Sequence, residues 1–409
     1  MLFFVDEANS IKLDYVDLLN KIANKKILHK YTYTSNIEDV LIDIVASLYY
    51  ACDIELLDGD FSNEELTLLN VSIEDLNIEY HLVNKTKNIN IDKLLETINE
   101  NKDNIKIGIY SSGTTGMPKR FEHSLTSLLR NIKVSEKHSY DIWGLAYNIT
   151  HFAGIQVFLQ ALMNKNTVVN LFNANMNNAN YLLEKYKCTC LSATPTFYRN
   201  FVFNRKSVNK FIKYITFGGE GFDNNLLSKA KEKFPKAKIR NIYASTEIGS
   251  LLAGNDDSFK VPRHLENLIK ISDENHLLVH KSLLNSDLKL DWYDTKDIVH
   301  FNDDGSFKIL NRDSDFINVG GYKVNPLEVE GEILKIKGVL DVVVTSRSNS
   351  VLGRILVANI KKDSLYSEIE LKKIIMQDLK NKLQSFKIPR LINFVDDIER
   401  NRSGKKVRT

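Results

Sequence analysis

The sequence predicts an α/β protein in two parts: a large amino-terminal domain of layered α/β sheets plus small β-structure, and a small mobile α+β carboxyl-terminal domain. Strand-like and helix-like segments alternate between about residues 106 and 243, which is typical of a layered α/β sheet. After Ser250, strand-like segments follow one another without helices between them. Past Arg312, a new and short alternation of helix and strand begins. We therefore expect domains over residues 1–312 and 313–409.

The individual elements are predicted from apolar periodicity and turn residues. In the large domain, strand-like runs cover 143–148, 167–171, 189–193, 214–217 and 239–243. The pair Asp304-Gly305 indicates a hairpin over 297–310, because Asp-Gly favours a tight turn. In the small domain we expect helices from about 326 and over about 366–383, with strands near 339–346, 352–360 and 391–395.

The composition is typical of a globular protein. Of the 409 residues, 43% are hydrophobic and 26% charged, and the formal net charge is +3. So small a charge on so long a chain gives no reason to expect a nucleic-acid partner, and no apolar run reaches membrane-spanning length. The first residues lack a basic region and a signal-length apolar core. We expect a cytoplasmic monomer or homodimer.

The three cysteines are too few, and odd in number, for a disulfide framework. Cys188 and Cys190 alternate in a predicted strand, so they would lie on one face. We expect buried thiols rather than a metal pair, because no second Cys/His pair stands nearby in the sequence.

Residues 110–119 concentrate glycines, hydroxyl side chains and one lysine between a predicted strand, 106–110, and leucines at helical spacing over 123–138. Backbone N–H groups, hydroxyls and a lysine together suit a phosphate group. The spacing excludes a Walker loop, because Lys119 follows Met117-Pro118 rather than a glycine. A surface turn rich in Gly and Ser is the alternative.

The same stretch resembles the Ser/Thr-Gly-Thr-Thr-Gly-x-Pro-Lys signature of the adenylate-forming superfamily, which includes acyl- and aryl-CoA synthetases, peptide-synthetase adenylation domains and luciferase-type enzymes. The resemblance runs from about Leu13 to Arg408 and is nearest the acyl-CoA synthetases. The part before Tyr110 is short for this family, so we expect some amino-terminal elements to be missing. The resemblance implies that the following residues bind ATP: Ser111, Ser112, Gly113, Thr114, Thr115, Gly116 and Lys119.

Two further motifs imply the rest of the ATP and magnesium site. One, Tyr243-Ala244-Ser245-Thr246-Glu247, resembles Tyr-Gly-x-Thr-Glu, with Ala244 in place of the usual glycine. It implies that Tyr243 stacks on adenine, Thr246 hydrogen-bonds the α-phosphate and Glu247 holds Mg²⁺. Alone, Glu247 would be read as a solvated loop charge. The other, Gly218-Gly219-Glu220, resembles the segment that lies along the adenine, with Gly219 also facing the acid.

The ribose contacts are implied by two motifs farther along the chain. Residues 293–297 resemble Tyr-x-Thr-Gly-Asp, which assigns Asp297 to the ribose hydroxyls, although Lys296 stands where glycine is usual. Residues 311–330 resemble the family's longest conserved-looking block, in which Arg312 contacts the ribose. There Ser314 falls on the hinge between domains, and Gly320 and Gly321 flank the tunnel for the thiol.

The carboxyl end, Ser403-Gly404-Lys405, resembles the family's Ser-Gly-Lys tail. Lys405 takes the catalytic position, where an ammonium neutralises the substrate carboxylate and the α-phosphate as they approach. A solvated basic tail is the alternative. Lys406 is the neighbour we would choose as a control.

The resemblance implies a two-step reaction. With ATP and Mg²⁺ the enzyme converts a carboxylic acid into acyl-AMP and pyrophosphate, with Lys405, Thr246 and Glu247 as catalytic residues. Rotation of the small domain about Ser314 then admits a thiol, most simply that of CoA, which takes the acyl group.

The acid class is suggested by Thr150-His151-Phe152-Ala153-Gly154, which resembles the His-x-x-Gly segment of acyl- and aryl-CoA synthetases. The chain lacks the Phe-Asp pair of amino-acid-activating domains, so we expect a fatty, aryl or related acid that contacts His151 and Gly219. A packed core histidine is the alternative for His151. The other residues expected to line the pocket are Trp143, Tyr147, Ser192, Thr194 and Tyr198.

Three other functions stay open. The acceptor could be the phosphopantetheine of an acyl carrier protein rather than CoA. The chain could be a degenerate nucleotide- or acyl-binding protein, although the joint presence of Lys119, Glu247, Asp297, Arg312 and Lys405 argues against that. A luciferase-type oxygenase would share every motif.

Overall fold

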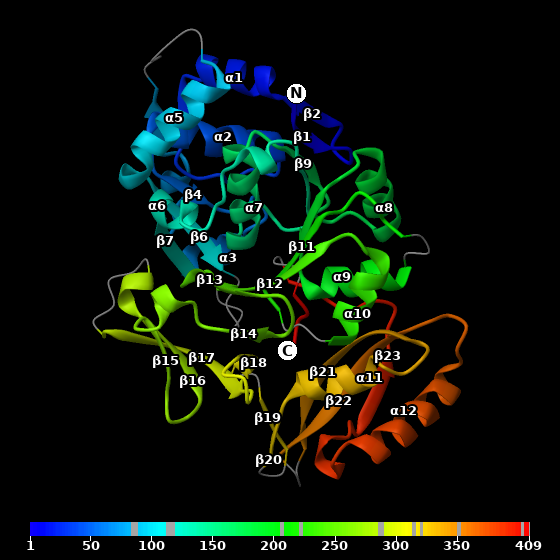
Figure 1. The fold of residues 1–409 in the computed structure, drawn as a ribbon. Helices are drawn as coiled ribbons and strands as arrows, with labels where there is room; N and C mark the ends of the chain where they lie inside the picture. The colour runs from blue at the N-terminus through cyan, green and yellow to red at the C-terminus, as the bar shows by residue number, and fades with distance from the viewer. Residues whose placement is uncertain are drawn as a thin grey trace.

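The computed structural model has the two-part α/β architecture that the sequence predicts (Figure 1). Everything below concerns the residues that it describes. These are 1–82, 89–111, 119–204, 208–220, 224–284, 290–312, 316–319, 322–349, 353–401 and 405–408.

An eight-stranded sheet forms the centre of the large domain, with the strand order β13-β12-β11-β10-β8-β9-β1-β2. The strands from β12 to β1 pair in parallel, and β13 and β2 pair antiparallel at the two edges. All five predicted strands of this region are confirmed. The bounds are β1 Leu2–Asp6, β2 Ile11–Asp14, β8 Ile142–Leu145, β9 Thr167–Asn170, β10 Cys190–Ala193, β11 Tyr214–Gly218, β12 Lys238–Ser245 and β13 Gly249–Gly254.

Helices pack against this sheet and bury most of their apolar residues. The helix α2 is apolar on nearly all sides, and eleven of its fourteen residues, from Val40 to Tyr50, are buried. Two hydrophobic cores result, one around α2 and α7 and one around α8, α9 and α10. The bounds are α1 Tyr15–Asn24, α2 Ile37–Tyr50, α5 Ile91–Asn101, α7 Phe152–Met163, α8 Met176–Lys185, α9 Pro195–Asn204 and α10 Asn224–Lys233.

A small three-stranded sheet holds the two ends of the proposed phosphate loop. Its order is β4 (Ile54–Leu56), β6 (Lys106–Ser111) and β7 (Lys119–Ser124), and β6 pairs antiparallel with β7. Shorter elements nearby are β3 Ile27–His29, α3 Asn63–Leu68, α4 Ile73–Leu76 and β5 Glu79–His81.

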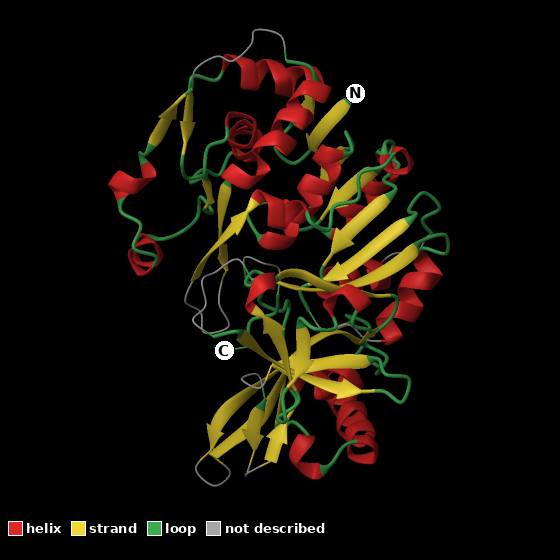
Figure 2. Cartoon of the chain, turned by 60° about the vertical axis from the view of Figure 1, so that its left-hand side comes forward, coloured by secondary structure: helices red, strands yellow, loops and turns green. Residues whose placement is uncertain are grey.

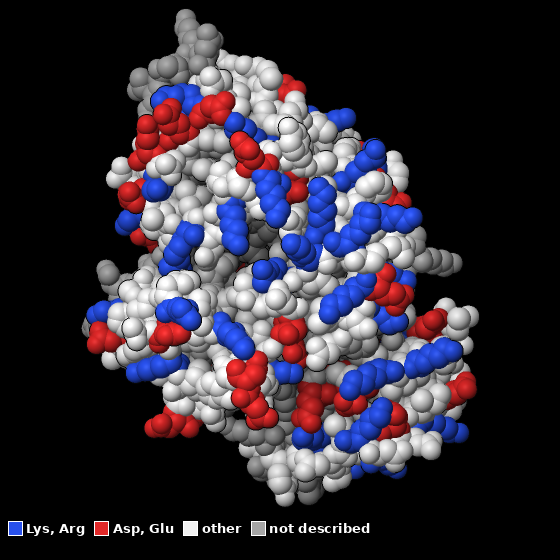
Figure 3. Space-filling view, in the orientation of Figure 1, with Lys and Arg blue, Asp and Glu red and all other residues white. Residues whose placement is uncertain are grey.

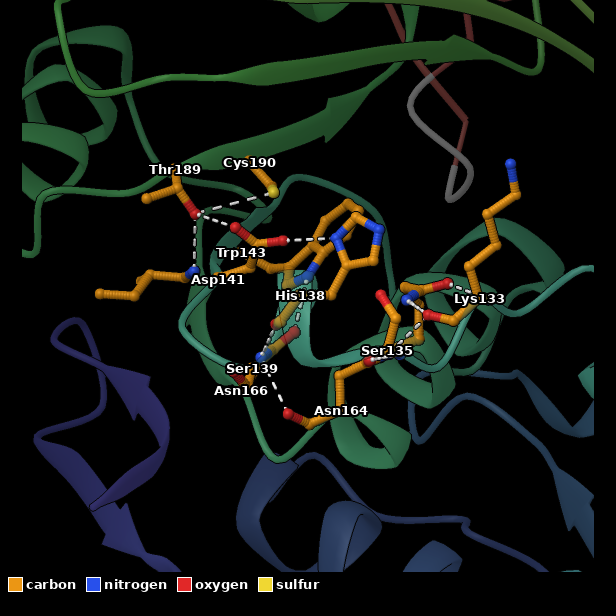
Figure 4. Close-up of polar contacts among 12 residues, drawn as sticks. Lys133, Ser135, His138, Ser139, Asp141, Trp143, Asn164, Asn166, Thr189 and Cys190 are labelled. Carbon is orange, nitrogen blue, oxygen red and sulfur yellow. Dashed lines mark hydrogen bonds and ion pairs between the residues drawn. The ribbon is translucent and has the colours of Figure 1, made fainter.

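The helical spacing over 123–138 was misleading. Residues up to Ser124 belong to β7, and the helix α6 covers only Leu125–Leu129. The polar stretch that follows is held by side chains from the loop between α7 and β9 instead of continuing the helix. Asn164 donates to the carbonyl of Lys133 (3.0 Å), and Asn166 donates to the carbonyl of His138 (2.6 Å), as Figure 4 shows.

A five-stranded antiparallel sheet follows, with the order β14-β18-β17-β16-β15. The predicted hairpin is confirmed as β17 and β18, and Gly305 in its turn has a φ of 74°. The bounds are β14 Ser258–Phe259, β15 Ile269–Ile271, β16 His276–His280, β17 Trp292–Phe301 and β18 Phe307–Arg312.

The elements after residue 316 have a hydrophobic core of their own, drawn entirely from residues 317–392. The predicted helices and strands of this region are confirmed. They are β19 Ile317–Val319, β20 Tyr322–Val324, α11 Pro326–Ile333, β21 Val339–Asn349, β22 Gly353–Lys362, α12 Glu368–Lys382 and β23 Leu391–Phe394. The chain then returns toward the large domain, so that its carboxyl end lies between the two parts in both views (Figures 1 and 2). Within the described ranges, no helix combines the length and the apolar character needed to cross a membrane.

Candidate active site

Four of the predicted site residues of the large domain lie at one edge of the central sheet. Gly218 is the last residue of β11, and Tyr243, Ala244 and Ser245 end β12. Because β11 and β12 are parallel neighbours, their carboxyl ends meet, which is the edge where ligands bind in open α/β sheets.

Lys405 reaches this edge from the small domain. A Cβ atom built on Gly219 would lie 3.5 Å from Cε of Lys405. Gly219 has a φ of 85°, a backbone conformation that glycine adopts at little cost. The structure therefore brings the predicted catalytic lysine against the predicted nucleotide segment.

The two residues assigned to adenine and ribose also lie together. The hydroxyl of Tyr243 donates to Oδ2 of Asp297, and Asp297 is 6% exposed. On the adjacent strand, the backbone of Arg312 pairs with Asp297. Lys296, which stands where the family motif has glycine, has a φ of 61°, in the left-handed region that favours glycine, and its ammonium pairs with Asp294 at 2.7 Å.

The turn after β12, which contains Thr246 and Glu247, packs against a buried histidine that the sequence analysis missed. His123, on β7, is 1% exposed and hydrogen-bonds with the backbone of Thr246. Burial lowers the pKa of His123 to about 4, outweighing the opposing effects of Thr246 and Glu247, so the ring is neutral near pH 7. His123 thereby joins the phosphate-loop sheet to the proposed magnesium ligand.

The base of the phosphate loop is clamped by a buried carboxylate. Glu55, on β4, accepts hydrogen bonds from the Tyr110 hydroxyl (2.9 Å) and from Nε of Arg120 (2.9 Å). A Cβ on Gly108 would lie 1.8 Å from Oε2 of Glu55, so a larger residue there would have to displace the Glu55 carboxylate. Lys119 is the first residue of β7, paired with Ser111. The remaining predicted loop residues, Ser112, Gly113, Thr114, Thr115 and Gly116, lie outside the described residues, as does the side chain of Ser111.

His151 is the N-cap residue of α7, and Asp58 holds its ring. Nε2 of His151 lies 2.9 Å from Oδ2 of Asp58, which is 7% exposed. Asp58 also accepts hydrogen bonds from Asn148 (2.9 Å) and from the hydroxyl of Thr150. Burial acts to raise the pKa of Asp58, but these donors outweigh it and hold the pKa below its ordinary value. Asp58 is therefore ionised at neutral pH.

Three of the five residues expected to line the acid pocket lie near the edge of the sheet that carries Gly219. Tyr147 is buried and donates to the carbonyl of Gly218 (3.4 Å), and Ser192 shares a hydrogen bond with Thr216 at the same edge. Thr194 is also buried there, just after β10. Two residues of the expected wall are placed elsewhere. Tyr198 is fully buried in the second core, where its hydroxyl donates to the carbonyl of Leu191.

Trp143 is the other misplaced wall residue. It lies in the first half of β8, and its Nε1 lies 3.3 Å from Asn166, which precedes β9 (Figure 4). That contact puts it toward the amino ends of the parallel strands, away from the edge that carries Gly219.

Glu220 points at a helix rather than along the nucleotide segment. Its Oε2 accepts a hydrogen bond from the backbone N–H of Thr196 (2.9 Å), in the first turn of α9. A carboxylate at a helix amino terminus stabilises the helix, so Glu220 fixes α9 beside Gly219.

Several predictions fall outside the described residues or outside the site. The hinge residue Ser314 and the tunnel glycines Gly320 and Gly321 are not described, nor is the side chain of Arg312. Cys188 and Cys190 are both buried, and burial raises the pKa of Cys188 to about 12. Among the described residues, no group of three His, Cys, Asp or Glu side chains could hold a metal ion.

Lys406 is unsuitable as a control for Lys405, although it is the next residue, because its side chain is buried and paired. It is 7% exposed, its ammonium lies 2.6 Å from Oδ1 of Asp341, and it donates to the carbonyl of Val342. Replacing it would leave a buried carboxylate with one cation fewer.

The residues that the sequence analysis missed are His123, Glu55, Asp58 and Asp341. Glu55 and Asp341 gave a usable signal, since each is an ionisable residue within an apolar strand. The partners of Asp58 and His123 lie far away in sequence, so no local pattern marks them.

Comparison with known proteins shows the family to which both parts of the chain are similar. The family model described as "AMP-binding enzyme" matches residues 36–277, and "AMP-binding enzyme C-terminal domain" matches residues 328–405. The chain is 27% identical to 4-hydroxybutyrate–CoA ligase 1 of Metallosphaera sedula, over 74% of this chain and 61% of that protein. It is 25% identical to 2-succinylbenzoate–CoA ligase of Listeria innocua, over 85% of this chain and 81% of that protein.

Solved structures share the fold. The o-succinylbenzoate CoA synthetase of Bacillus subtilis, in complex with its acyl-adenylate intermediate, has a TM-score of 0.70 at 18% identity, covering 100% of this chain and 94% of that one. A benzoate CoA ligase from Burkholderia xenovorans has a TM-score of 0.75 at 15% identity, covering 99% and 95%. Since the first family match alone spans more than half of the chain, the protein belongs to the AMP-binding enzymes, the adenylate-forming family that its motifs resemble.

Proposed function

We propose that the protein joins a carboxylic acid to the thiol of CoA in two steps. In the first, the acid carboxylate attacks the α-phosphorus of ATP, which gives acyl-AMP and releases pyrophosphate. In the second, the CoA thiol attacks the acyl carbon, which gives acyl-CoA and releases AMP. The observation that carries this proposal is the contact of Lys405 with Gly219, beside the pair Tyr243 and Asp297.

The fixed orientation of Asp297 supports the proposal that this part of the site binds the nucleotide. Its hydrogen bonds with the Tyr243 hydroxyl and from its own backbone N–H to Thr295 Oγ1 (3.1 Å) hold the segment in place. A carboxylate held in this way accepts hydrogen bonds from ribose hydroxyls without a further loss of conformational freedom. Gly218 and Gly219 then leave room for the flat adenine beside Tyr243.

Lys405 would act on the reacting atoms. An ammonium beside the acid carboxylate and the α-phosphate reduces their mutual repulsion, and it stabilises the negative charge on the phosphorus oxygens as the new bond forms. The basic side chains around a hollowed part of the large domain, between α7 and β11 in Figure 3, would favour the approach of polyanionic ATP.

Glu247 fits a magnesium ion. It follows β12 at the site edge, and a carboxylate is the hard oxygen ligand that Mg²⁺ prefers. When bound, the ion would neutralise charge on the ATP phosphates. His123 contributes by hydrogen-bonding the backbone of Thr246, which holds the turn that presents both Thr246 and Glu247.

For the acid we propose a fatty, aryl or related acid without an α-ammonium group. His151 is held by Asp58, and the two relatives named above are ligases of 4-hydroxybutyrate and of 2-succinylbenzoate, neither of which is an amino acid. The second step would follow rotation of the small domain, with Ser314 as hinge and Gly320-Gly321 beside the thiol.

The test is pyrophosphate release from Mg·ATP with a panel of fatty, aryl and amino acids, with and without CoA. The variants are Lys405→Ala and, as a matched control, Lys373→Ala, an exposed lysine on α12. We expect release that depends on one acid class, is stimulated by CoA, and falls by about 100-fold in Lys405→Ala but not in Lys373→Ala. Acid-dependent release that CoA does not stimulate would instead indicate a carrier-protein acceptor. No release by folded protein that binds ATP would contradict the proposal.

A further inference from the structure

Lys405 lies in a short antiparallel pairing whose two legs are residues 400–401 and 405–406. Arg400 and Lys406 form a β-bridge, and the backbone N–H of Asn401 donates to the carbonyl of Lys405 (2.8 Å). Oδ1 of Asn401 accepts the N–H of Lys405 in return (3.0 Å). The two legs are thus joined at the residue that reaches Gly219 and at its neighbour Lys406.

Both legs are fastened to the small domain by one carboxylate. Asp341, on β21, is 1% exposed and pairs with two cations, Lys406 through Oδ1 (2.6 Å) and Arg400 through Oδ2 (2.8 Å). Because neighbouring side chains on an extended segment point to opposite sides, burying Lys406 against Asp341 turns Lys405 outward. Farther on, Arg408 pairs with buried Glu330 at 3.0 Å.

Arg400 also reaches the large domain. With its amide oxygen facing the guanidinium, Asn200 accepts hydrogen bonds from Nη2 (2.9 Å) and Nη1 (3.1 Å) of Arg400. Asn200 lies on α9, the helix whose first turn is capped by Glu220, the residue next to Gly219. A line of polar contacts therefore runs from Asp341 through Arg400 to Asn200, and it ends on the helix beside the segment that Lys405 contacts.

We infer that Arg400 is a positioning residue, which holds the small domain in the arrangement that forms acyl-AMP by bridging Asp341 and Asn200. This inference rests on the proposed function. The contact of Arg400 with Asp341 lies within the small domain and would be kept when that domain rotates. The contact of Arg400 with Asn200 joins the two domains and would be broken by that rotation. The bridge therefore favours the first step and must open before the second.

Variants of Asn200 test this inference, since they leave the buried pair of Arg400 and Asp341 intact. Asn200→Ala removes the acceptor on α9, and Asn200→Asp replaces it with a carboxylate that binds the guanidinium more strongly. Asn177→Ala, an exposed asparagine on α8, is the matched control. Two rates are measured separately: acyl-AMP formation in a single turnover, and thioester formation from acyl-AMP that is supplied ready-made.

We expect Asn200→Ala to slow acyl-AMP formation by about tenfold and to leave thioester formation unchanged or faster, because a charge-assisted contact is lost in only one arrangement. Asn200→Asp should show the opposite split, with normal acyl-AMP formation and slower thioester formation. If a variant changed both rates in the same direction, together with the free energy of unfolding, Asn200 would have a structural role only and the inference would be wrong.

A distance measurement tests the bridge without relying on catalysis. Spin labels are placed at Asn177→Cys on α8 and Lys373→Cys on α12, in a Cys52→Ser background, since Cys188 and Cys190 are buried. We expect one narrow distance distribution, which Asn200→Ala broadens and Asn200→Asp does not. Identical distributions in all three proteins would overturn the inference. If the unmodified enzyme released no pyrophosphate with any acid, the proposed function would fail, and the distances would still decide whether Arg400 holds the domains.

Discussion

Cε of Lys405 lies 3.5 Å from the position that a Cβ on Gly219 would take, and this contact joins the end of the small domain to the end of β11. The two residues are far apart in sequence, and they belong to separate motifs. Under the proposed function, in which Lys405 acts at the reacting carboxylate, this domain arrangement is the one that forms acyl-AMP.

Replacing Gly219 with alanine should impair acyl-AMP formation by about tenfold or more, because the methyl group adds strain at a positive φ and occupies the space beside Lys405. Gly305→Ala is the matched control. Gly305 also has a positive φ, of 74°, but nothing lies within 4 Å of its added Cβ. Both variants should lose about 1 kcal/mol of unfolding free energy, and only Gly219→Ala should lose activity. Equal activities would contradict the assignment of Gly219.

Removing Lys405 should lower activity, whereas removing Lys406 should lower the free energy of unfolding. Lys406→Ala should lower the free energy of unfolding by about 2–3 kcal/mol, because it removes one of two cations from the buried Asp341. Lys405→Ala should leave the free energy of unfolding unchanged within about 0.5 kcal/mol and lower adenylation by about 100-fold. Urea denaturation of both variants measures the difference. A stable and active Lys406→Ala protein would show that the ion pair of Lys406 with Asp341 is not needed to hold the chain end in place.

Tyr243→Phe should raise the KM for ATP by about three- to tenfold, because the ring stays while the hydrogen bond that orients Asp297 is lost. Tyr181→Phe, on an exposed residue of α8, is the control. Steady-state kinetics with ATP varied and the acid saturating gives the comparison. An effect confined to the KM for the acid would place Tyr243 outside the nucleotide site.

His123 should make stability fall in mild acid. Its pKa is about 4 in the folded protein and about 6.5 when unfolded, so below pH 6.5 the unfolded chain binds a proton that the folded chain does not. The contribution of His123 to the free energy of unfolding is complete above pH 6.5. It is lost progressively toward pH 4, by about 3 kcal/mol in total. Unfolding free energies of the unmodified protein and of His123→Gln, measured from pH 8 to pH 4, isolate this effect as their difference. A difference that does not vary with pH would contradict it.

Asp58→Asn should raise the KM for the acid by about tenfold and leave the KM for ATP unchanged, because His151 loses the carboxylate that orients it. Kinetics with the acid varied at saturating ATP provides the measurement. If neither constant changed, His151 would be the packed core histidine that the sequence left as the alternative.

Local patterns predicted the strands and helices that are regular over several residues, such as β8 to β12 and α12. They failed at 123–138. The leucines of α6 have helical spacing there, but the residues before them pair with β6, and those after them are held by Asn164 and Asn166. The resemblance assigned a ligand role to each of Tyr243, Asp297, Gly219 and Lys405, and those roles stay predictions. The contacts of Tyr243 with Asp297 and of Lys405 with Gly219 were not predicted and come from the structure.

The supporting residues could not be predicted in this way. His151 and Asp58 are 93 positions apart, and Lys406 and Asp341 meet only because the chain end folds back on β21. A buried carboxylate looks like any surface Asp in a sequence until the topology brings two donors to it. Trp143 and Tyr198 show the converse case, since both were expected in the pocket wall but Tyr198 is buried in the second core and Trp143 packs, partly buried, against the first.

The most direct test of the account is to mix the protein with Mg·ATP and an acid from the responsive class, without CoA, and to analyse the bound products by mass spectrometry. The account predicts acyl-AMP in an amount close to that of the enzyme, about 100-fold less in Lys405→Ala, and its conversion to acyl-CoA when CoA is added. Formation of ADP and an acyl phosphate, or of AMP whether or not the acid is present, would contradict it.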